Sequence, residues 1–575
     1  MSFRKGRPEA AASADRPRAA RTDETPRSIY DILSIAVIAV LGVLVCATFR
    51  DYGITTDEYV QQVYGEKLWD FFLSGFRDRS AFTFDNLYLY GGLFDMVAVP
   101  LQALSPFEPY ETRHLLSGLT GVAGVFVVWR LGRLLAGPRS GFLAAALLGL
   151  CASWYGAMFN NTKDIPFAVA MTSMLYLGCR MLPDLPRPPW PIVVAFGIAL
   201  GLALGLRVGA LLGLFCLLAA AAVQIAAASR GSGWRSALRG GLIFVGRLLP
   251  AFGMAYGLMA LFWPWSVLSL LNPLHAISGL TQFTFRTELG NEYFPANQLP
   301  ALYLPMYIAI KLPEVVLVGC LATLAAVNVR IFRRGRSVSG SSQGGEGQVG
   351  AAWRPGGWSQ ALLLALWVVV PIAYFVIGRP SLYNGMRHFF FVVPPLCVVA
   401  AVGLDRLLFW TTAWRRSAGV VTAGLLLLAA ADEVATIRSL HPHQYIYYNA
   451  LVRGPGGAFR RYEMDYWSNF LPEALALLER RLRSEQNGRM PTRRYTVGLC
   501  TREEILAEYA PPFLTAIKDW KRADFIITTT NTDCDLFASG RTIIEVSRDG
   551  AVLGVVKDRR PGMTAQGTTT AAPIR

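Results

Sequence analysis

The run from Tyr30 to Arg50, YDILSIAVIAVLGVLVCATFR, is followed closely by the short acidic turn TTDE at residues 55–58. The run carries almost no charge and has the ~20 residues that an α-helix needs to cross the ~30 Å hydrocarbon core of a bilayer. It therefore predicts a transmembrane helix. The turn places Asp57 and Glu58 directly after this helix, at a membrane surface.

The composition predicts many such helices. Of the 575 residues, 53% are hydrophobic and only 16% are charged, which is too apolar for an ordinary soluble enzyme. We expect a mainly α-helical polytopic membrane protein with about eleven spans. The run 91–107 is interrupted by Asp95 and Pro100, so we expect it to lie at the interface or to re-enter the membrane. The predicted spans are 30–50, 112–134, 140–158, 165–182, 192–206, 209–228, 241–263, 313–331, 360–378, 389–408 and 418–437.

The basic residues predict the orientation of these spans. Lys and Arg collect in residues 1–27 and in every second loop, which is typical of the cytoplasmic side. The net charge of +16 then reflects orientation and contact with membrane lipids, and we do not expect nucleic acid as a partner. Residues 1–27 are expected to form a disordered basic cytoplasmic tail, and no short cleavable signal precedes the first span.

An odd number of spans leaves the C-terminal part outside the cytoplasm. Residues 438–560 regain polar character and alternate short β-like runs with helical patterns, which predicts a small extracytoplasmic α/β domain. The β-like runs are Tyr495–Cys500, Phe525–Thr530, Thr542–Val546 and Val552–Val556, and the helical ones are Pro472–Arg483 and Arg502–Tyr509. Residues 561–575 are expected to be disordered. Whether Cys500 and Cys534 of this domain form a disulfide stays open.

Two interpretations compete for the acidic turn. Thr55 and Glu58 have the spacing of a capping box, in which Glu58 has a structural role at a helix start. That arrangement would leave Asp57 free in the first turn, where the helix dipole favours the ionised carboxylate. An ionised carboxylate can act as a general base.

Further polar residues lie at the predicted outer ends of other spans. Asp164 precedes Ile165-Pro166, so it is either a helix cap or a second carboxylate that orients an acceptor, with Lys163 supplying positive charge. Arg207 is either the interfacial end of a helical hairpin or part of a site.

Arg387 and His388, together with Arg379, lie on the outer side against the orientation rule, which favours a role in binding phosphate over a snorkelling cation. The aromatic loop 272–312 is either an interfacial belt or a lid. All of these residues can line one cavity that opens outward.

The order and common sidedness of these motifs resemble the GT-C glycosyltransferases. An acidic pair follows the first span, a second Asp lies in Asn161-Thr162-Lys163-Asp164-Ile165-Pro166-Phe167, and Gly385-Met386-Arg387-His388-Phe389 enters a late span. The branch most similar is family 39, with the protein O-mannosyltransferases, the lipid A aminoarabinose transferases and the rhizobial lipopolysaccharide galacturonosyltransferases. The resemblance covers roughly residues 28–437, the expected transmembrane catalytic module.

The resemblance implies transfer of a sugar from a polyprenyl-phosphate donor at the outer face of the cytoplasmic (inner) membrane. It maps the catalytic carboxylate onto Asp57. The His-Pro-Pro-x-Gly-Lys segment of protein O-mannosyltransferases is replaced by Asn86-Leu87-Tyr88-Leu89-Tyr90-Gly91-Gly92, which favours a glycolipid or polysaccharide acceptor. The runs Tyr447–Leu451 and Glu463–Trp467 are similar to a signature of uncharacterised bacterial members, without an assigned role.

The residue chemistry agrees with this reading. A polyprenyl phosphate needs charge stabilisation when it leaves, for which Lys163, Arg207, Arg387 and His388 are candidates. The acceptor hydroxyl needs a base, for which Asp57 is the candidate, and Glu58 and Asp164 are supporting acids. One base without a nucleophile favours a single displacement with inversion.

Other functions stay open. A lipid-sugar transporter or flippase is disfavoured because the acids cluster at one face rather than at the membrane midplane. A non-catalytic membrane protein with a glycan-binding outer domain is the third possibility. No motif requires a cofactor or a metal, although a divalent cation could bind if Asp57, Glu58 and Asp164 meet in space. The sugar, the acceptor and the oligomeric state are not encoded by any motif.

Overall fold

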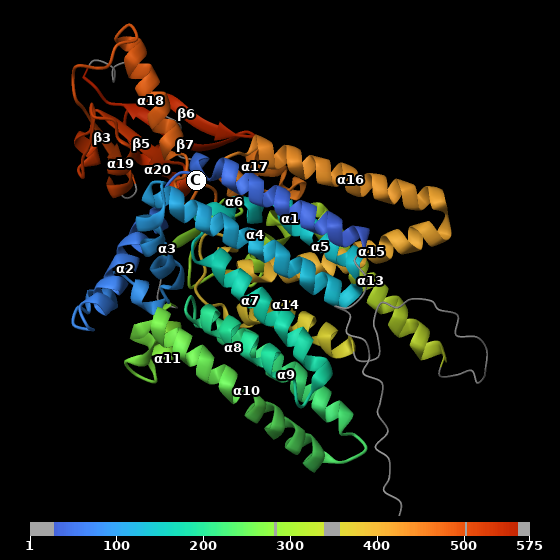
Figure 1. The fold of residues 1–575 in the computed structure, drawn as a ribbon. Helices are drawn as coiled ribbons and strands as arrows, with labels where there is room; N and C mark the ends of the chain where they lie inside the picture. Colours follow the sequence, from blue (N-terminus) through green and yellow to red (C-terminus); the bar gives the residue numbers. More distant parts are fainter. Residues whose placement is uncertain (1–27, 281–284, 338–356, 501–502, 562–575) are drawn as a thin grey trace, which may run out of the picture.

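The computed structural model describes residues 28–280, 285–337, 357–500 and 503–561. Of the predicted tails 1–27 and 561–575, residues 1–27 and 562–575 lie outside the described residues. A long helical bundle makes up most of the molecule, and a small β-sheet domain lies at one of its ends (Figure 1).

Every predicted span corresponds to helical structure. Within the described ranges, eight helices are long and apolar enough to cross a membrane, or up to ten if each of two bent pairs is one span. The protein is therefore a multi-pass membrane protein. The eight are α1 (Ile29–Thr48), α4 (Pro109–Ala136), α7 (Asp164–Met181), α9 (Ala210–Ala228), α10 (Trp234–Phe262), α14 (Gly357–Gly378), α15 (Val393–Trp414) and α16 (Arg416–Ser439).

The remaining predicted spans are broken or short. The run 140–158 is the pair α5 (Pro138–Gly149) and α6 (Ala152–Asn160), bent by 61°. The run 313–331 falls in α13 (Glu314–Ser337), which follows α12 (Tyr303–Lys311) at a bend of 114°. The run 192–206 is the 15-residue helix α8 (Trp190–Leu204). Helix breaks expose backbone groups, and such breaks in a membrane are tolerated where protein or a cavity satisfies those groups.

Small residues allow the helices of the bundle to approach closely. At Gly403 of α15, a Cβ atom would overlap the backbone of Gly319 in α13, so the two helices meet backbone to backbone. Ion pairs add specific links between helices. Asp31 of α1 accepts from the guanidinium of Arg133 in α4 at 2.7 Å, and Arg139 of α5 pairs with Asp405 of α15.

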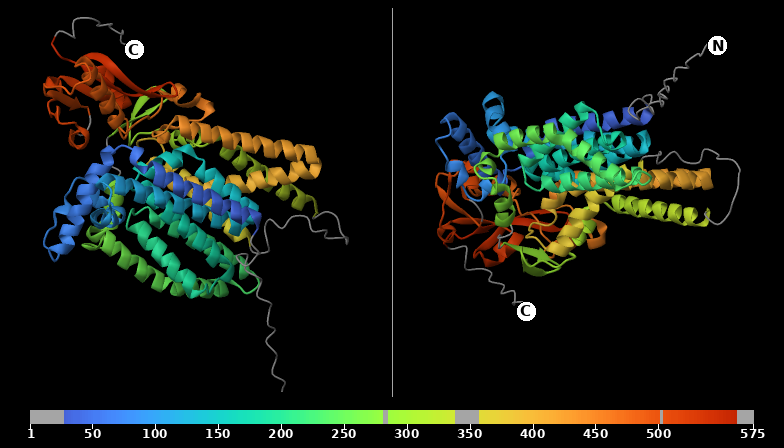
Figure 2. Two further views of the ribbon diagram at one scale, coloured as in Figure 1. Left: turned by 45° about the horizontal axis from the view of Figure 1, so that its top comes forward. Right: turned by 90° about the horizontal axis from the view of Figure 1, so that it is seen from below.

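Short elements gather at the end of the bundle that carries the sheet domain. The run 91–107, expected at the interface, forms the 12-residue helix α3 (Leu93–Leu104) beside α2 (Thr56–Leu73). The loop 272–312 contains α11 (Asn272–Leu280) and the hairpin of β1 (Arg286–Leu289) and β2 (Glu292–Pro295). A 3₁₀ turn, η7 (Arg387–Val392), leads into α15. Figure 2 shows from two further sides that α2, α3 and the sheet domain occupy this same end.

The C-terminal domain is a mixed five-stranded sheet in the order β4-β3-β5-β7-β6. The four predicted strands appear as β3 (Tyr495–Leu499), β5 (Phe525–Thr529), β6 (Arg541–Arg548) and β7 (Ala551–Asp558). The predicted helices appear as α18 (Leu471–Glu485) and α19 (Glu503–Tyr509), and the further elements are α17 (Gly454–Ala458), α20 (Cys534–Phe537) and the edge strand β4 (Leu514–Ala516).

A disulfide joins Cys500 and Cys534 in this domain, with Cα atoms 6.5 Å apart. Cys500 follows β3 and Cys534 begins α20, so the bond connects the end of a central strand to the segment after β5. The sequence alone left this pairing open, because it contained no information on the distance between the two segments.

The chain between α16 and α18 packs back onto the bundle. Tyr445, Ile446, Tyr448 and Trp467 of this stretch are buried, although the stretch contains little regular structure. The backbone amide of Asn449 donates to Ile310 O at 3.0 Å, and its side-chain amide donates to Ala309 O at 2.7 Å and Leu312 O at 2.8 Å. Asn449 thereby satisfies carbonyl groups that the break between α12 and α13 leaves free.

Candidate functional site

The acidic turn begins α2 as a capping box. Thr55 is the N-cap, its hydroxyl accepts from Glu58 N at 3.3 Å, and the Glu58 carboxylate accepts from Thr55 N at 2.9 Å. Glu58 is fully buried and also lies 3.2 Å from His114 Nε2. The structural interpretation of Glu58 is therefore confirmed. Its neighbour Asp57 is the second residue of the helix and has no part in the box.

Asp57 faces Arg387 from the opposite side of the site. Arg387 is 7% exposed, and its Nη2 donates to Asp57 Oδ2 at 2.6 Å, while its Nε lies 3.4 Å from Asp164 Oδ2. One guanidinium thus connects the two carboxylates, as its planar fork of donors allows. Burial raises the pKa of Asp57, but the charges of Arg387 and Lys163 outweigh it and hold that pKa below its ordinary value. The carboxylate is consequently ionised at neutral pH, and its side chain keeps 36% exposure.

Asp164 is not the helix cap that one interpretation predicted. Helix α7 begins at Asp164 itself, and the capping side chain is that of Asn161, whose Oδ1 accepts from Asp164 N at 2.8 Å. The Asn161 amide also donates to Asp164 Oδ2 at 2.7 Å. Because Asn161 does the capping, the Asp164 carboxylate is available to pair with Arg207 and Arg387.

Arg207 is held against a tyrosine ring that the sequence did not single out. The Arg207 guanidinium lies 5.5 Å from the centroid of Tyr90, and Lys163 Nζ lies 4.6 Å from the same centroid. The segment of Tyr90 is pinned by Gly91, whose amide donates to Leu206 O at 3.1 Å. A Cβ atom at Gly91 would overlap the Gly205 backbone, so only glycine permits this approach.

Lys163 differs from the two arginines in having no ion-pair partner. It is 7% exposed, and within the described part of the chain no carboxylate lies within ion-pair distance of its ammonium. Burial lowers the pKa of Lys163 to about 8, although Asp95 and Asp57 act in the opposite direction. A buried cation without a partner is costly, and it is a ready binding group for an anionic ligand.

Aromatic rings enclose the Arg387 side of the site. The Arg387 guanidinium lies 5.7 Å from the centroid of Tyr383, 5.9 Å from Tyr466 and 5.5 Å from Trp467. His388, predicted to contact phosphate, packs edge-on against Tyr383 with centroids 4.7 Å apart. Sequence reasoning missed the roles of these rings. The available signal is the run Glu463–Trp467, which is similar to a signature of uncharacterised bacterial members that has no assigned role.

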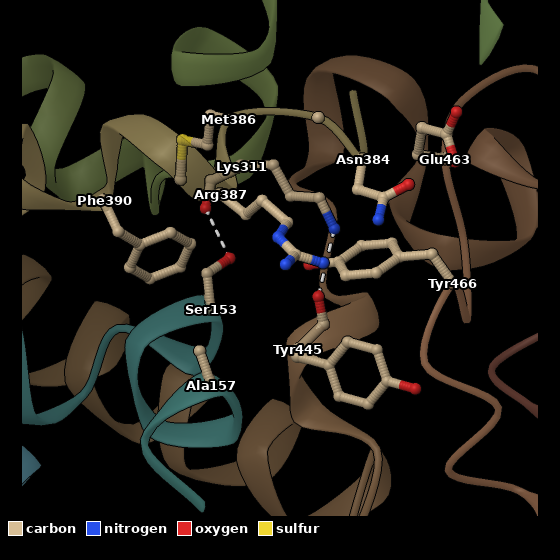
Figure 3. Close-up of a pocket in the computed structure, with 11 residues that line it drawn as sticks. Ser153, Ala157, Lys311, Asn384, Met386, Arg387, Phe390, Tyr445, Glu463 and Tyr466 are labelled. Carbon is tan, nitrogen blue, oxygen red and sulfur yellow. Dashed lines mark hydrogen bonds between the residues drawn. The ribbon is translucent and has the colours of Figure 1, made fainter. Parts of the chain in front are cut away.

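Behind Arg387 lies a small cavity of about 10 Å³, roughly the space of one water. Figure 3 shows Lys311 and Arg387 extending into it from one side, with Tyr466 and Tyr445 opposite. Lys311 Nζ donates to Tyr445 O at 3.1 Å. Glu463, also in the lining, accepts from the Thr287 hydroxyl at 2.6 Å, and burial raises its pKa. Lys311, the last residue of α12, and Glu463 thus line the cavity next to the break between α12 and α13.

The structure thus brings together Asp57, Lys163, Asp164, Arg207 and Arg387, and directs Glu58 to a cap and to His114. In the residues it describes, no group of three His, Cys, Asp or Glu side chains is arranged to hold a metal ion. The position between Asp57 and Asp164 is occupied by the Arg387 guanidinium.

Comparison with known proteins relates part of the chain to a family. Residues 112–245 match the family model described as dolichyl-phosphate-mannose-protein mannosyltransferase. Among curated protein sequences, no relative matches the chain.

Solved structures of low identity also align with the chain. The apo structure of ArnT from Cupriavidus metallidurans is 16% identical, covering 91% of this chain and 97% of that one, with a TM-score of 0.46. The same protein bound to undecaprenyl phosphate is 15% identical, covering 92% and 98%, with a TM-score of 0.46. The archaeal oligosaccharyltransferase AglB from Archaeoglobus fulgidus, in complex with an inhibitory peptide and a dolichol-phosphate, is 12% identical, covering 86% and 69%, with a TM-score of 0.46.

Proposed function

We propose, from the match of residues 112–245 to the dolichyl-phosphate-mannose-protein mannosyltransferase model and from the motifs that resemble GT-C enzymes, that the chain is a membrane glycosyltransferase. It transfers a sugar from a polyprenyl-phosphate donor to a glycolipid or polysaccharide acceptor. The reaction takes place at the outer face of the cytoplasmic (inner) membrane, with the N-terminus inside and the C-terminal domain outside. The observation that carries the proposal is an ionised, partly exposed Asp57 beside the unpaired, buried Lys163.

Asp57 is the general base. The acceptor hydroxyl gives its proton to Asp57 Oδ, and its oxygen forms a bond with the anomeric carbon of the donor sugar. The bond from that carbon to the phosphate oxygen breaks, and the polyprenyl phosphate leaves with the electron pair. The base function needs an ionised carboxylate in contact with solvent, as found for Asp57, and contributes typically ~10²–10⁴-fold to such a reaction.

Lys163 is the principal phosphate ligand. Arg207 is neutralised in part by Asp164, and Arg387 by Asp57 and Asp164, whereas Lys163 has no carboxylate as an ion-pair partner. The leaving phosphate gains negative charge as the bond breaks. A preorganised ammonium therefore stabilises the transition state more than it stabilises the bound donor. Arg207 and Arg387 complete the positive side of the site, and the neutral His388 ring beside Tyr383 is a further candidate contact for the phosphate. Asp164 orients the two arginines.

A single displacement inverts the anomeric configuration. Asp57 is held in place by Arg387, and Asp164 is 1% exposed between two arginines, so neither arrangement supplies a second carboxylate free to attack the sugar. The stereochemistry of the product, read by NMR of the anomeric proton, tests this step. Retention of configuration would contradict it.

The direct test of the function is transfer of radiolabelled sugar. Purified protein is mixed with a panel of polyprenyl-phosphate sugars and with membrane lipids or polysaccharide extracted from the host, and label in the acceptor fraction is counted. We expect label to move with the wild type for one donor and not with Asp57→Asn. If the folded protein transfers label from no donor to any acceptor, the transporter and glycan-binding alternatives replace this proposal.

The pH dependence should report Lys163. Because the pKa of Lys163 is about 8, its charged form is lost as the pH rises through that value. We therefore expect kcat/KM for the donor, which reflects the free enzyme, to fall above about pH 8. On the acid side, the pKa of Asp57 lies below its ordinary 3.8, so kcat/KM should not decline until the pH is below that value.

Lys163→Arg is the matched variant for this pH profile, because a guanidinium stays charged over the whole range. It should move the alkaline limb upward and leave the acid limb unchanged. An alkaline limb that stays in place in Lys163→Arg would assign it to another group.

A further inference from the structure

The loop that carries Asp57 is held by residues far away in the chain. The amide of Gly53 donates to Asn469 Oδ1 at 2.5 Å, and the carbonyl of Gly53 accepts from Asn160 Nδ2 at 3.1 Å. Thr56 N donates to Trp467 O at 3.3 Å. The backbone that leads into α2 is therefore bonded to the stretch between α16 and α18.

A further contact to this loop comes from the sheet domain itself. Ile54 N donates to the hydroxyl oxygen of Tyr509 at 2.6 Å, and Tyr509 is the last residue of α19. Its helix is anchored in that domain by Ile505 and Leu506, which are 2% and 0% exposed. Tyr509 thus reaches from the domain to the loop three residues before the base.

The Ile54 amide needs this partner. Ile54 is 5% exposed, and a buried backbone N–H without a partner costs ~1–3 kcal/mol. Loss of the Tyr509 hydroxyl would favour a shift of the loop toward water. Because Thr55 is the N-cap of α2 and Asp57 is the second residue of the helix, a shift at Ile54 moves the carboxylate as well.

Close packing at Gly53 shows how little room the loop has to move. A Cβ atom there would lie 2.6 Å from Asn469 Oδ1, 2.8 Å from Asn469 O and 3.0 Å from Pro472 Cδ. Distances below 3.0 Å exclude a side chain unless a neighbour moves, and one of these neighbours is backbone. The loop therefore packs directly against Asn469 and Pro472 of the C-terminal domain.

We propose that the C-terminal domain is part of the active site, and that Tyr509 is a positioning residue that sets Asp57 through the Ile54 amide. The proposal rests on the proposed function, in which Asp57 is the base. It assigns the domain a role in catalysis by the membrane-embedded module. A base must be held to within a fraction of an ångström of its productive position, and a displacement of ~1 Å can cost ~10²-fold.

Tyr509→Phe is the variant that tests this role, because it keeps the ring and removes only the hydroxyl. We expect kcat to fall roughly 10-fold or more with the donor KM unchanged, since the base and not the phosphate ligands is displaced. Tyr495→Phe is the matched control. Tyr495 lies on β3 of the same domain, where its ring packs on Phe525 with centroids 5.6 Å apart, and its variant should keep the wild-type kcat.

A second readout does not depend on activity. Hydrogen exchange of the peptide covering residues 50–58, followed by mass spectrometry on the full-length protein, should be faster in Tyr509→Phe than in the wild type and unchanged in Tyr495→Phe. Gly53→Ala disturbs the loop from its other side and should give the same faster exchange together with a lower kcat.

The outcomes separate this proposal from the proposed function. An inactive Asp57→Asn with a fully active, normally exchanging Tyr509→Phe would overturn the role of Tyr509 alone. An active Asp57→Asn would overturn the role of Asp57 as the base. A reduced kcat in Tyr509→Phe without faster exchange of the peptide would contradict positioning through Ile54.

Discussion

Replacing Asp57 with asparagine is expected to reduce sugar transfer by ~10²–10⁴-fold, the usual contribution of a general base, while the protein keeps its stability. The amide has the same shape as the carboxylate but cannot take the proton of the acceptor hydroxyl. Arg387 loses one of its two acidic partners and keeps Asp164, and the lost partner is 36% exposed. We therefore expect the free energy of unfolding to change by no more than about 1 kcal/mol.

Glu58→Ala is the matched control for Asp57→Asn, because it removes the adjacent carboxylate. Glu58 caps α2 and faces His114, so its loss should cost about 1–2 kcal/mol of stability. The two neighbours should thus differ in their main effect. Asp57→Asn loses rate at unchanged stability, whereas Glu58→Ala loses thermal stability and, because it caps the helix that carries Asp57, no more than about 10-fold in rate. The initial rate of sugar transfer and the melting temperature, measured for both variants, test this difference. An Asp57→Asn protein with more than a tenth of wild-type activity is incompatible with the assignment.

The second large effect is expected at Arg387. Arg387→Met leaves the Asp57 and Asp164 carboxylates near each other without the guanidinium that connects them. Removing one partner of a buried pair typically costs ~3–5 kcal/mol, and we expect about 3 kcal/mol because Asp57 is partly exposed and Asp164 keeps Arg207. Arg415→Met, at an exposed arginine before α16, should change stability by less than ~0.5 kcal/mol.

Arg387 should also control the pH range of the proposed base, Asp57. Its charge is the largest of the influences that lower the pKa of Asp57, and burial acts against it. Without Arg387 the pKa of Asp57 rises, so the base becomes protonated at a higher pH and the acid limb of kcat/KM moves upward. Arg387→Lys retains a positive charge but not the planar guanidinium that reaches both carboxylates. Its acid limb should therefore lie between the acid limbs of the wild type and of the variant without the charge. An acid limb in Arg387→Lys that coincides with the wild type, in a folded protein, would show that Arg387 does not tune Asp57.

Features that depend on local sequence were predictable. Each apolar run became a helix because a backbone in hydrocarbon must satisfy its own hydrogen bonds. The capping box at Thr55 and Glu58 depends on a spacing of three residues, and it too is present in the structure. The four longer strands and the two helices of the C-terminal domain followed from their periodicity, whereas the three-residue strand β4 was too short to leave a pattern.

Features that depend on contacts between distant segments were not predictable. Asp164 had a plausible local role as a cap, and only the structure shows that Asn161 takes that role. The disulfide between Cys500 and Cys534 depends on a distance that no spacing encodes. Tyr90, Tyr466 and Trp467 lie in runs that the sequence marks, but their contacts with arginine could not be predicted, because cation–π contact is a property of relative position.

The sequence by itself determined that the chain is a multi-pass membrane protein with a capped acidic turn after its first span, because hydropathy and capping act over one helix turn or one helix length. Only the tertiary structure decided which charges share a site. Arg387 and Asp57 are 330 positions apart, and Tyr509 lies 455 positions from the Ile54 amide that it accepts from. The choice of such partners depends on helix packing and on the seat of the C-terminal domain, which arise from the whole core and not from any one segment.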